Sequence, residues 1–203
     1  MKSMKSAFLP MHVCLVMLLL LFPVFSRAQI VFEKGFEISG GAGLDGKTRY
    51  AAGASFVGAL RFNPFLSIGA GVGYQHALAL TSKETVVGSG LNNKYEHADR
   101  LKLFGRVKGN FTRNRISPFA AVDAGAAVKL SKSSLNPVSG FFAEPALGCD
   151  FGLQGRQKLA VFVGYQLQNT HYLASLTSEG KVMDVVDKQD FAGILTLHLG
   201  FYF

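Results

Sequence analysis

Two residues near the C-terminal end have the types that a hydrolytic site needs. His171 and Ser175 are four positions apart in a polar segment, and a serine activated by a histidine is a common nucleophile for ester hydrolysis. Thr170 and Tyr172 flank the histidine, and no Ser–His hydrolase motif surrounds the pair. Spacing alone does not bring two side chains within reach of each other. We therefore predict no catalytic residue in this chain.

The other polar residues give no pattern that is specific for a catalytic, cofactor or metal site. Asp184, Asp187 and Asp190 place in one segment the acidic residues that an Asp/His protease site needs, and a solvated loop explains them as well. Residues 88–90 read Gly-Ser-Gly but lack the Gly-Lys-Ser/Thr continuation of a phosphate loop. The net charge of +8 falls to +5 without residues 1–28, which hold three of the 21 basic residues and no acidic one. We expect no cofactor, no metal ion and no nucleic-acid partner.

Charged residues also recur within segments that are otherwise apolar or small. They are Glu37, Arg61, Lys102, Arg106, Lys108, Asp123, Lys129, Glu144 and Asp150. A charge in a membrane is costly unless an opposite charge pairs with it. Arg106 would face Asp123 if the turn between their segments is centred on residues 114–115. We predict that this pair belongs to a buried charge network, and we favour a structural role for it over a conducting or gating role.

The elements that must position these charges are strands, because the chain alternates with a period of two residues. The chain contains 23 Gly, and only 17% of its residues are charged, against roughly 25% in ordinary soluble domains. The alternating segments are longer than the ~5–6 residues of typical soluble strands and suit tilted membrane-spanning strands. We predict strands at residues 34–44, 50–62, 66–78, 101–111, 118–130, 140–154, 158–168 and 190–203.

The two faces of these strands differ in bulk. One face carries large apolar residues, whereas the other carries Gly, Ala, Ser and the charges listed above. An eight-stranded barrel has an interior just wide enough for side chains, so the bulky face would overfill it. The sequence therefore predicts an all-β fold, an eight-stranded antiparallel transmembrane β-barrel, with the small and charged face inside. A soluble ligand-binding barrel of lipocalin type is the alternative fold.

The first 28 residues are predicted to be a cleaved signal peptide. Lys2 and Lys5 precede an apolar run from Val13 to Phe25, which is too short for a convincing membrane-spanning helix. Residues 26–28 place small residues at the −3 and −1 positions of a cleavage site. The barrel would then comprise residues 29–203 and retain one cysteine, Cys149, which excludes an internal disulfide.

The last strand ends in an alternating apolar pattern that reaches the final residue. The pattern consists of Leu195, Leu197, Leu199, Phe201 and Phe203. It resembles the C-terminal signature of outer-membrane barrel proteins, and the chain as a whole is similar to the small outer-membrane β-barrel family of the OmpA and OmpX kind. The resemblance implies an outer-membrane location, contact with outer-membrane lipid, and recognition of the final strand by the barrel-assembly machinery.

The expected function is that of a non-enzymatic outer-membrane protein with a structural or surface-interaction role. Two long polar loops, residues 79–99 and 171–188, would reach an extracellular partner, and the basic short turns would reach lipid headgroups or a periplasmic partner. The alternatives are a barrel enzyme that acts on outer-membrane lipid or peptide, of the lipid A deacylase type, and the lipocalin-like barrel.

Overall fold

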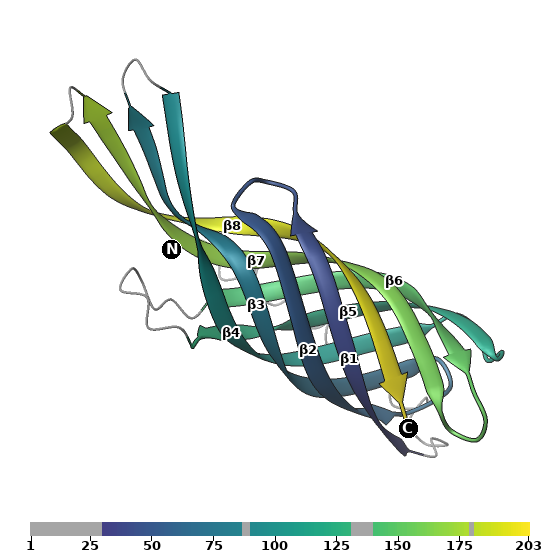
Figure 1. The fold of residues 1–203 in the computed structure, drawn as a ribbon. Coiled ribbons are helices and arrows are strands. Elements are labelled where there is room, and N and C mark those ends of the chain that lie inside the picture. Colours follow the sequence, from purple (N-terminus) through teal and green to yellow (C-terminus); the bar gives the residue numbers. More distant parts are fainter. Residues whose placement is uncertain (1–29, 87–89, 131–139, 179–180) are drawn as a thin grey trace, which may run out of the picture.

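The computed structural model describes residues 30–86, 90–130, 140–178 and 181–203, which form one closed antiparallel β-barrel (Figure 1). Each strand pairs with its neighbour in the chain, and β1 pairs with β8 to close the ring. The fold class predicted from the alternation is confirmed. The strands are β1 (Val31–Gly43), β2 (Thr48–Arg61), β3 (Leu66–Val86), β4 (Gly90–Asn110), β5 (Ile116–Lys129), β6 (Gly140–Gly152), β7 (Lys158–Ser178) and β8 (Lys181–Tyr202).

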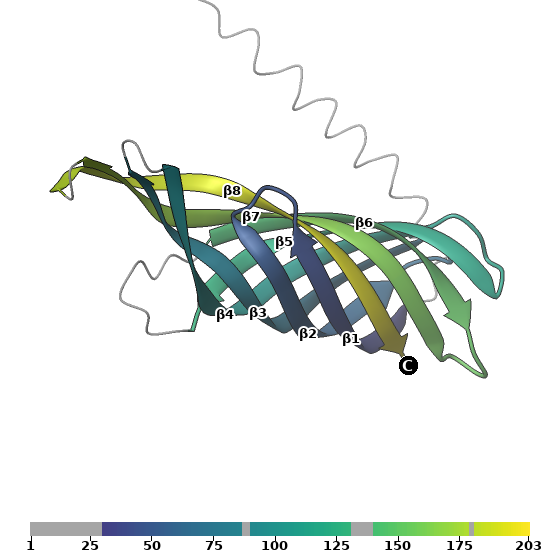
Figure 2. The same cartoon turned by 45° about the horizontal axis from the view of Figure 1, so that its top comes forward.

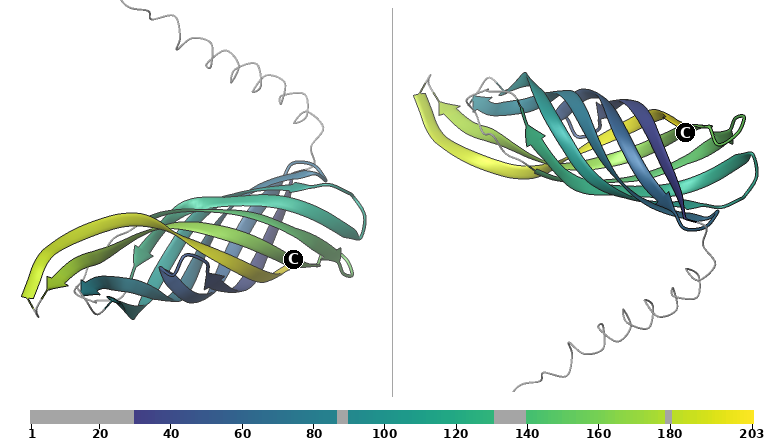
Figure 3. Two further views of the ribbon diagram at one scale, coloured as in Figure 1. Left: turned by 90° about the horizontal axis from the view of Figure 1, so that it is seen from above. Right: turned by 90° about the horizontal axis from the view of Figure 1, so that it is seen from below.

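The strands are tilted, and the register gives the size of the stagger. Following paired residues once around the ring from Leu66 leads back to β3 at His76, ten residues further along (66 to 76). A stagger of this kind is the geometric condition for closing a barrel whose strands lean by about 35–45°. The oblique crossing of the front and back strands is visible from several sides (Figures 2 and 3).

The distribution of side chains is inside-out with respect to a soluble barrel. Leu103, Val163 and Leu197 are 50%, 47% and 57% exposed, whereas Arg106 and Asp123 are 5% and 7% exposed. Large apolar residues therefore cover the outside of the barrel, and charged residues fill its interior. This arrangement is the one that hydrocarbon requires of a spanning sheet, since closure also leaves no unpaired strand edge. The lipocalin-like alternative, which needs the opposite arrangement, is wrong.

No helix in the described ranges has the length and hydropathy needed to cross a membrane.

Three short connections, residues 62–65, 111–115 and 153–157, lie at the same end of the barrel as the C-terminus; we call this the short-turn end (Figure 1). The opposite end, here the hairpin end, carries the tight β1–β2 turn, where Gly46 has a φ of +72°. The predicted signal peptide and the predicted connection at residues 131–139 lie outside the described residues.

The two long polar loops expected at residues 79–99 and 171–188 are instead strand hairpins. β3 and β4 continue as a paired ladder to Val86 and Gly90, and β7 and β8 continue to Ser178 and Lys181. Outside a bilayer both faces of a hairpin meet water, so both can be polar and the alternation that marks a strand disappears. A spanning strand needs only about 9–11 residues, so these hairpins extend well beyond the membrane.

The two hairpins also pair with each other. Residues 82–86 of β3 run parallel to residues 173–177 of β7. β3 and β7 are four places apart in the eight-strand ring, so they arise on opposite sides of the barrel. Their extensions therefore meet across its mouth and form a four-stranded sheet in the order β4-β3-β7-β8, seen at the upper left of Figure 1.

Glycine on the inner face makes space for the aromatic core. A Cβ added at Gly71 would overlap the ring of Phe104, which packs edge-on against Phe142 at a centroid distance of 6.2 Å. Gly105 lies on the outer face, and the nearest atom to an added Cβ there is 3.9 Å away. The two glycines thus differ in the space beside them.

We expect Gly71→Ala to destabilise the barrel by about 1–3 kcal/mol, the usual cost of overpacking a core. Gly105→Ala is the matched control and should change the free energy of unfolding by less than about 0.5 kcal/mol. Urea unfolding in lipid vesicles measures both values. Equal values for the two variants would contradict the packing described for the lumen.

Candidate functional site

Arg106 of β4 lies at the centre of the lumen and contacts two carboxylates. Its Nε and Nη2 donate to the two oxygens of Asp123 at 2.6 Å each, and Nη2 also donates to Glu37 Oε2 at 3.0 Å. Its Nη1 donates to Glu37 Oε1 and to the Tyr202 hydroxyl, which itself donates to Glu37. The four residues come from β4, β5, β1 and β8, so the cluster ties four strands together. The guanidinium fork matches this geometry because it can bind each carboxylate through two N–H groups.

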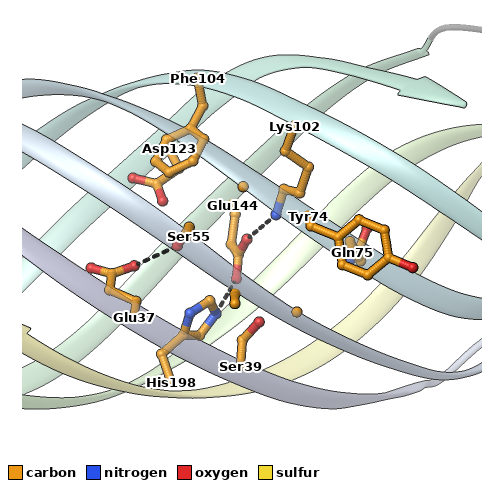
Figure 4. Close-up of a pocket in the computed structure, with 13 residues that line it drawn as sticks. Glu37, Ser39, Ser55, Tyr74, Gln75, Lys102, Phe104, Asp123, Glu144 and His198 are labelled. Carbon is orange, nitrogen blue, oxygen red and sulfur yellow. Dashed lines mark hydrogen bonds and ion pairs between the residues drawn. The ribbon is translucent and has the colours of Figure 1, made fainter. Parts of the chain in front are cut away.

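A second cluster surrounds Glu144 of β6. Its Oε1 accepts a hydrogen bond from Thr196 Oγ1 at 2.6 Å and lies 2.7 Å from His198 Nε2 (Figure 4). Its Oε2 lies 3.4 Å from Lys102 Nζ. The ring of His198 stacks on Phe162 at a centroid distance of 4.4 Å. Glu144 is thus held from three directions, and its charge is offset by a lysine.

The polar network continues toward both ends of the barrel. Toward the hairpin end, Lys102 donates to Gln166 at 3.1 Å, and Gln166 is bonded to Gln75 at 3.1 Å. Toward the short-turn end, Lys108 donates to Asp150 at 2.7 Å. The lumen is therefore filled by side chains along its length.

A cavity of about 20 Å³ remains beside Glu144 and His198, lined in part by Ser39 and Ser55 (Figure 4). A polar cavity of this volume has room for about one water molecule. The adjoining His198 Nδ1 is buried and makes no hydrogen bond within the described chain. A single bound water would satisfy it without opening a passage.

The nine charged residues singled out in the sequence separate into groups. Glu37, Arg106 and Asp123 form the central cluster, Lys102 and Glu144 the second, and Lys108 and Asp150 the pair nearest the short-turn end. Arg61 instead forms a salt bridge with Glu33 at 3.1 Å. Lys129 faces Arg100 in the β4–β5 register.

Sequence reasoning missed several members of these clusters. Tyr202 and Thr196 lie on the inner parity of the last strand, and Gln75 and Gln166 on that of β3 and β7. In each strand these residues alternate with lipid-facing ones, and this alternation is the sequence signal that assigns them to the lumen. The partner of each depends on the stagger around the ring, and a single chain does not reveal that stagger.

A separate polar cluster lies on the outer surface near the hairpin end. His76 Nδ1 is 2.8 Å from Asp99 Oδ1, and His76 Nε2 is 3.1 Å from His97 Nδ1. Tyr74 donates to the same oxygen of Asp99. His76 is ten residues above Leu66, a rise of about 25 Å along a tilted strand, which matches the height of the apolar band. The cluster therefore lies at headgroup level on the lipid-facing side.

These contacts join three side chains in a row. An ionised Asp99 can only accept, so His76 donates to it through Nδ1. In the contact between His76 Nε2 and His97 Nδ1 either nitrogen can be the donor, depending on the tautomer. The row Asp99–His76–His97 thus ends in an imidazole at the membrane surface. The sequence signal was the polar spacing Tyr74-x-His76 and His97-x-Asp99 on an otherwise apolar face.

The candidate pair His171 and Ser175 lies partly outside the described residues. The structure does not describe the side chain of His171, so no contact between the two is assigned. Asp190 is exposed, and the Lys47 ammonium 2.6 Å away lowers its pKa below the ordinary value. Among the residues that the structure describes, no group of three or more His, Cys, Asp or Glu side chains could hold a metal ion.

The alternating residues of the last strand lie on the lipid-facing surface. Leu195, Leu197 and Leu199 are exposed there, and the rings of Phe201 and Phe203 lie 6.0 Å apart. The ammonium of Lys34 lies 4.9 Å above the Phe203 ring. Recognition of this strand by the barrel-assembly machinery stays a prediction.

No model of a protein family matches the chain, and no curated protein matches it either. Solved structures that are similar include the N-terminal β-barrel domain of Pseudomonas aeruginosa OprF, with a TM-score of 0.47, 10% identity, and coverage of 86% of this chain and 100% of that one. Neisserial surface protein A has a TM-score of 0.48 and 11% identity, with coverage of 83% of this chain and 95% of that one. The outer membrane protein AlkL, solved by solid-state NMR in DMPC bilayers, has a TM-score of 0.47 and 13% identity, with coverage of 87% and 90%. The chain resembles these small outer-membrane barrels in architecture, and at these values the likeness extends to neither activity nor ligand.

Proposed function

We propose that this protein is a non-enzymatic, non-conducting barrel of the outer membrane that holds an extramembrane β-sheet at the membrane surface for structural or adhesive contact. The observation that carries the proposal is the filled lumen, in which ion pairs and amides follow one another from Asp150 to Gln75. A protein built to conduct would leave a continuous water-filled path, as larger barrels do.

The extended hairpins support the surface role. They double the length that β3, β4, β7 and β8 need to cross a membrane, and they are joined by the parallel pairing of residues 82–86 with 173–177. Val185 and Val186 are exposed on the β8 extension. Because successive side chains of a strand point to opposite faces, each face of this ordered sheet carries one exposed valine that a partner can contact.

Planar-bilayer recording tests the closed lumen. We expect the purified protein to give no steady conductance under conditions in which a porin in the same bilayer conducts. The reason is that an ion would have to displace Arg106 from Glu37 and Asp123, which are buried and hydrogen-bonded. A large, steady single-channel current would contradict the proposed function.

One observation favours a second candidate function, hydrolysis of an ester in an outer-leaflet lipid. The imidazole of His97 lies at headgroup level, where it contacts His76, which in turn contacts Asp99. In such a reaction water attacks the ester carbonyl, His97 takes the proton from that water, and the proton passes to the departing alkoxide.

Release of fatty acid from mixed micelles of phosphatidylethanolamine separates the two functions. Activity that His97→Gln abolishes and Lys94→Gln leaves unchanged would support the hydrolase. Absence of fatty-acid release, or equal release by the natural protein and His97→Gln, would exclude it and leave the non-enzymatic role.

A further inference from the structure

The lumen opens into a basic cavity at the short-turn end. The cavity has a volume of about 260 Å³, and its walls include the inward-facing Arg61, Asp150 and Lys158 together with Arg113 and Arg115 of the β4–β5 turn. A second cavity of about 300 Å³ adjoins it and shares Arg61 and Lys158. We call the first cavity the basic vestibule. Its volume is several times the roughly 30 Å³ that a water molecule occupies in the liquid, so it can hold a polyatomic ligand.

The acidic groups at this end already have partners. Asp150 accepts from Lys108 at 2.7 Å and from Asn110 at 3.0 Å. Glu33 forms salt bridges with Arg61 at 3.1 Å and with Lys158 at 2.6 Å. The walls of the vestibule hold four cations and one acid, so a positive charge remains there after these pairs are formed.

Arg113 and Arg115 supply that excess charge, and both are held in place. Arg115 donates through Nε to the carbonyl oxygen of Gly152 at 2.8 Å, which leaves its terminal nitrogens for other contacts. The guanidinium of Arg113 lies over the ring of Phe65 at 4.8 Å. Within the described ranges neither arginine forms a salt bridge. A guanidinium fixed through its Nε or its flat face presents its remaining N–H groups to an anion without further ordering.

We propose that the basic vestibule binds a soluble anion that carries phosphate groups. Planar guanidinium groups bind phosphate oxygens through paired hydrogen bonds, and Arg113 and Arg115 place two such groups in the lining of one cavity. The inner walls are lumen-facing side chains, so the ligand enters from water and not from the lipid side. The proposal rests on the proposed function only in taking the barrel to span an outer membrane, with water at the short-turn end.

Isothermal titration of pyrophosphate into the barrel, held in phosphatidylcholine nanodiscs, tests the proposal. We expect saturable binding of one pyrophosphate per chain. The double variant Arg113→Gln, Arg115→Gln should weaken it at least about tenfold, because each guanidinium contributes charge-assisted hydrogen bonds. The control is Arg49→Gln, which removes one positive charge at the hairpin end, where Arg49 lies over Tyr95.

Three results would overturn the proposal: no binding of pyrophosphate, unchanged binding in the double variant, or equal weakening by Arg49→Gln. Binding to nanodiscs that contain phosphatidylglycerol, with none to pyrophosphate, would assign the cavity to a lipid headgroup and overturn the soluble ligand. Both arginines lie in an exposed turn, and gel mobility before and after heating verifies that each variant is folded. None of these results depends on conductance. The anion-binding proposal and the proposed non-conducting function can therefore be refuted independently of each other.

Discussion

Replacing Arg106 with methionine is expected to destabilise the barrel by about 3–5 kcal/mol, the cost of leaving buried carboxylates without their cation. Glu37 and Asp123 are 1% and 7% exposed, and both accept hydrogen bonds from this guanidinium. Urea unfolding in lipid vesicles, monitored by gel mobility, gives the free energy of unfolding.

Two further variants isolate the electrostatic cause. Lys94→Met breaks a salt bridge of 3.0 Å to Glu96 on an exposed surface, and it should cost less than about 1 kcal/mol. Adding Glu37→Gln and Asp123→Asn to Arg106→Met removes the uncompensated charges and should restore part of the lost stability. A loss below about 1 kcal/mol for Arg106→Met, similar to a surface pair, would show that the central cluster is not buried as described.

The second large effect is expected on the outer face. Leu103→Arg places a cation in the apolar belt of β4 and should destabilise the barrel by about 2–4 kcal/mol, as arginine does near the middle of a bilayer. Val185→Arg is the matched control, because Val185 is 54% exposed on a hairpin beyond the membrane. The same unfolding assay applies. Equal costs at the two positions would mean that Leu103 does not face hydrocarbon.

The barrel itself could be predicted because the bilayer imposes a period of two on every spanning strand. The segment from Leu101 to Val107, for example, alternates between lipid-facing and lumen-facing residues throughout. The prediction failed beyond the membrane, where Ser82, Lys83, Glu84 and Thr85 are consecutive polar residues in a strand. With water on both faces, the strand has no apolar side, and only its pairing with β4 and β7 identifies it.

The contacts within the lumen likewise include one that the sequence predicts and others that it does not. Arg106 and Asp123 belong to one hairpin, so a symmetric turn suffices to place them opposite each other. The contacts of Arg106 with Glu37 and Tyr202 join residues that are 69 and 96 positions apart. To predict these contacts one must know the number of strands, that the ring closes, and its stagger of ten residues. No local sequence pattern gives any of the three.

The outer histidine cluster shows a different limit. Tyr74 and His76 fall on the lipid-facing parity, where an apolar residue is the default, and the alternation of the strand does not by itself assign them a role. Their significance appears only when the register brings His97 and Asp99 beside them. Polar residues that interrupt an apolar face in both strands of one hairpin are the feature to search for.

The inside-out arrangement is tested most directly by quenching of tryptophan fluorescence by brominated lipid. The chain contains no Trp, so a substitution introduces a single reporter. Leu197→Trp should be quenched strongly by lipids brominated near the middle of the bilayer and weakly by aqueous acrylamide, whereas Val185→Trp should show the reverse. Quenching of Leu197→Trp by acrylamide alone would contradict the membrane-spanning barrel.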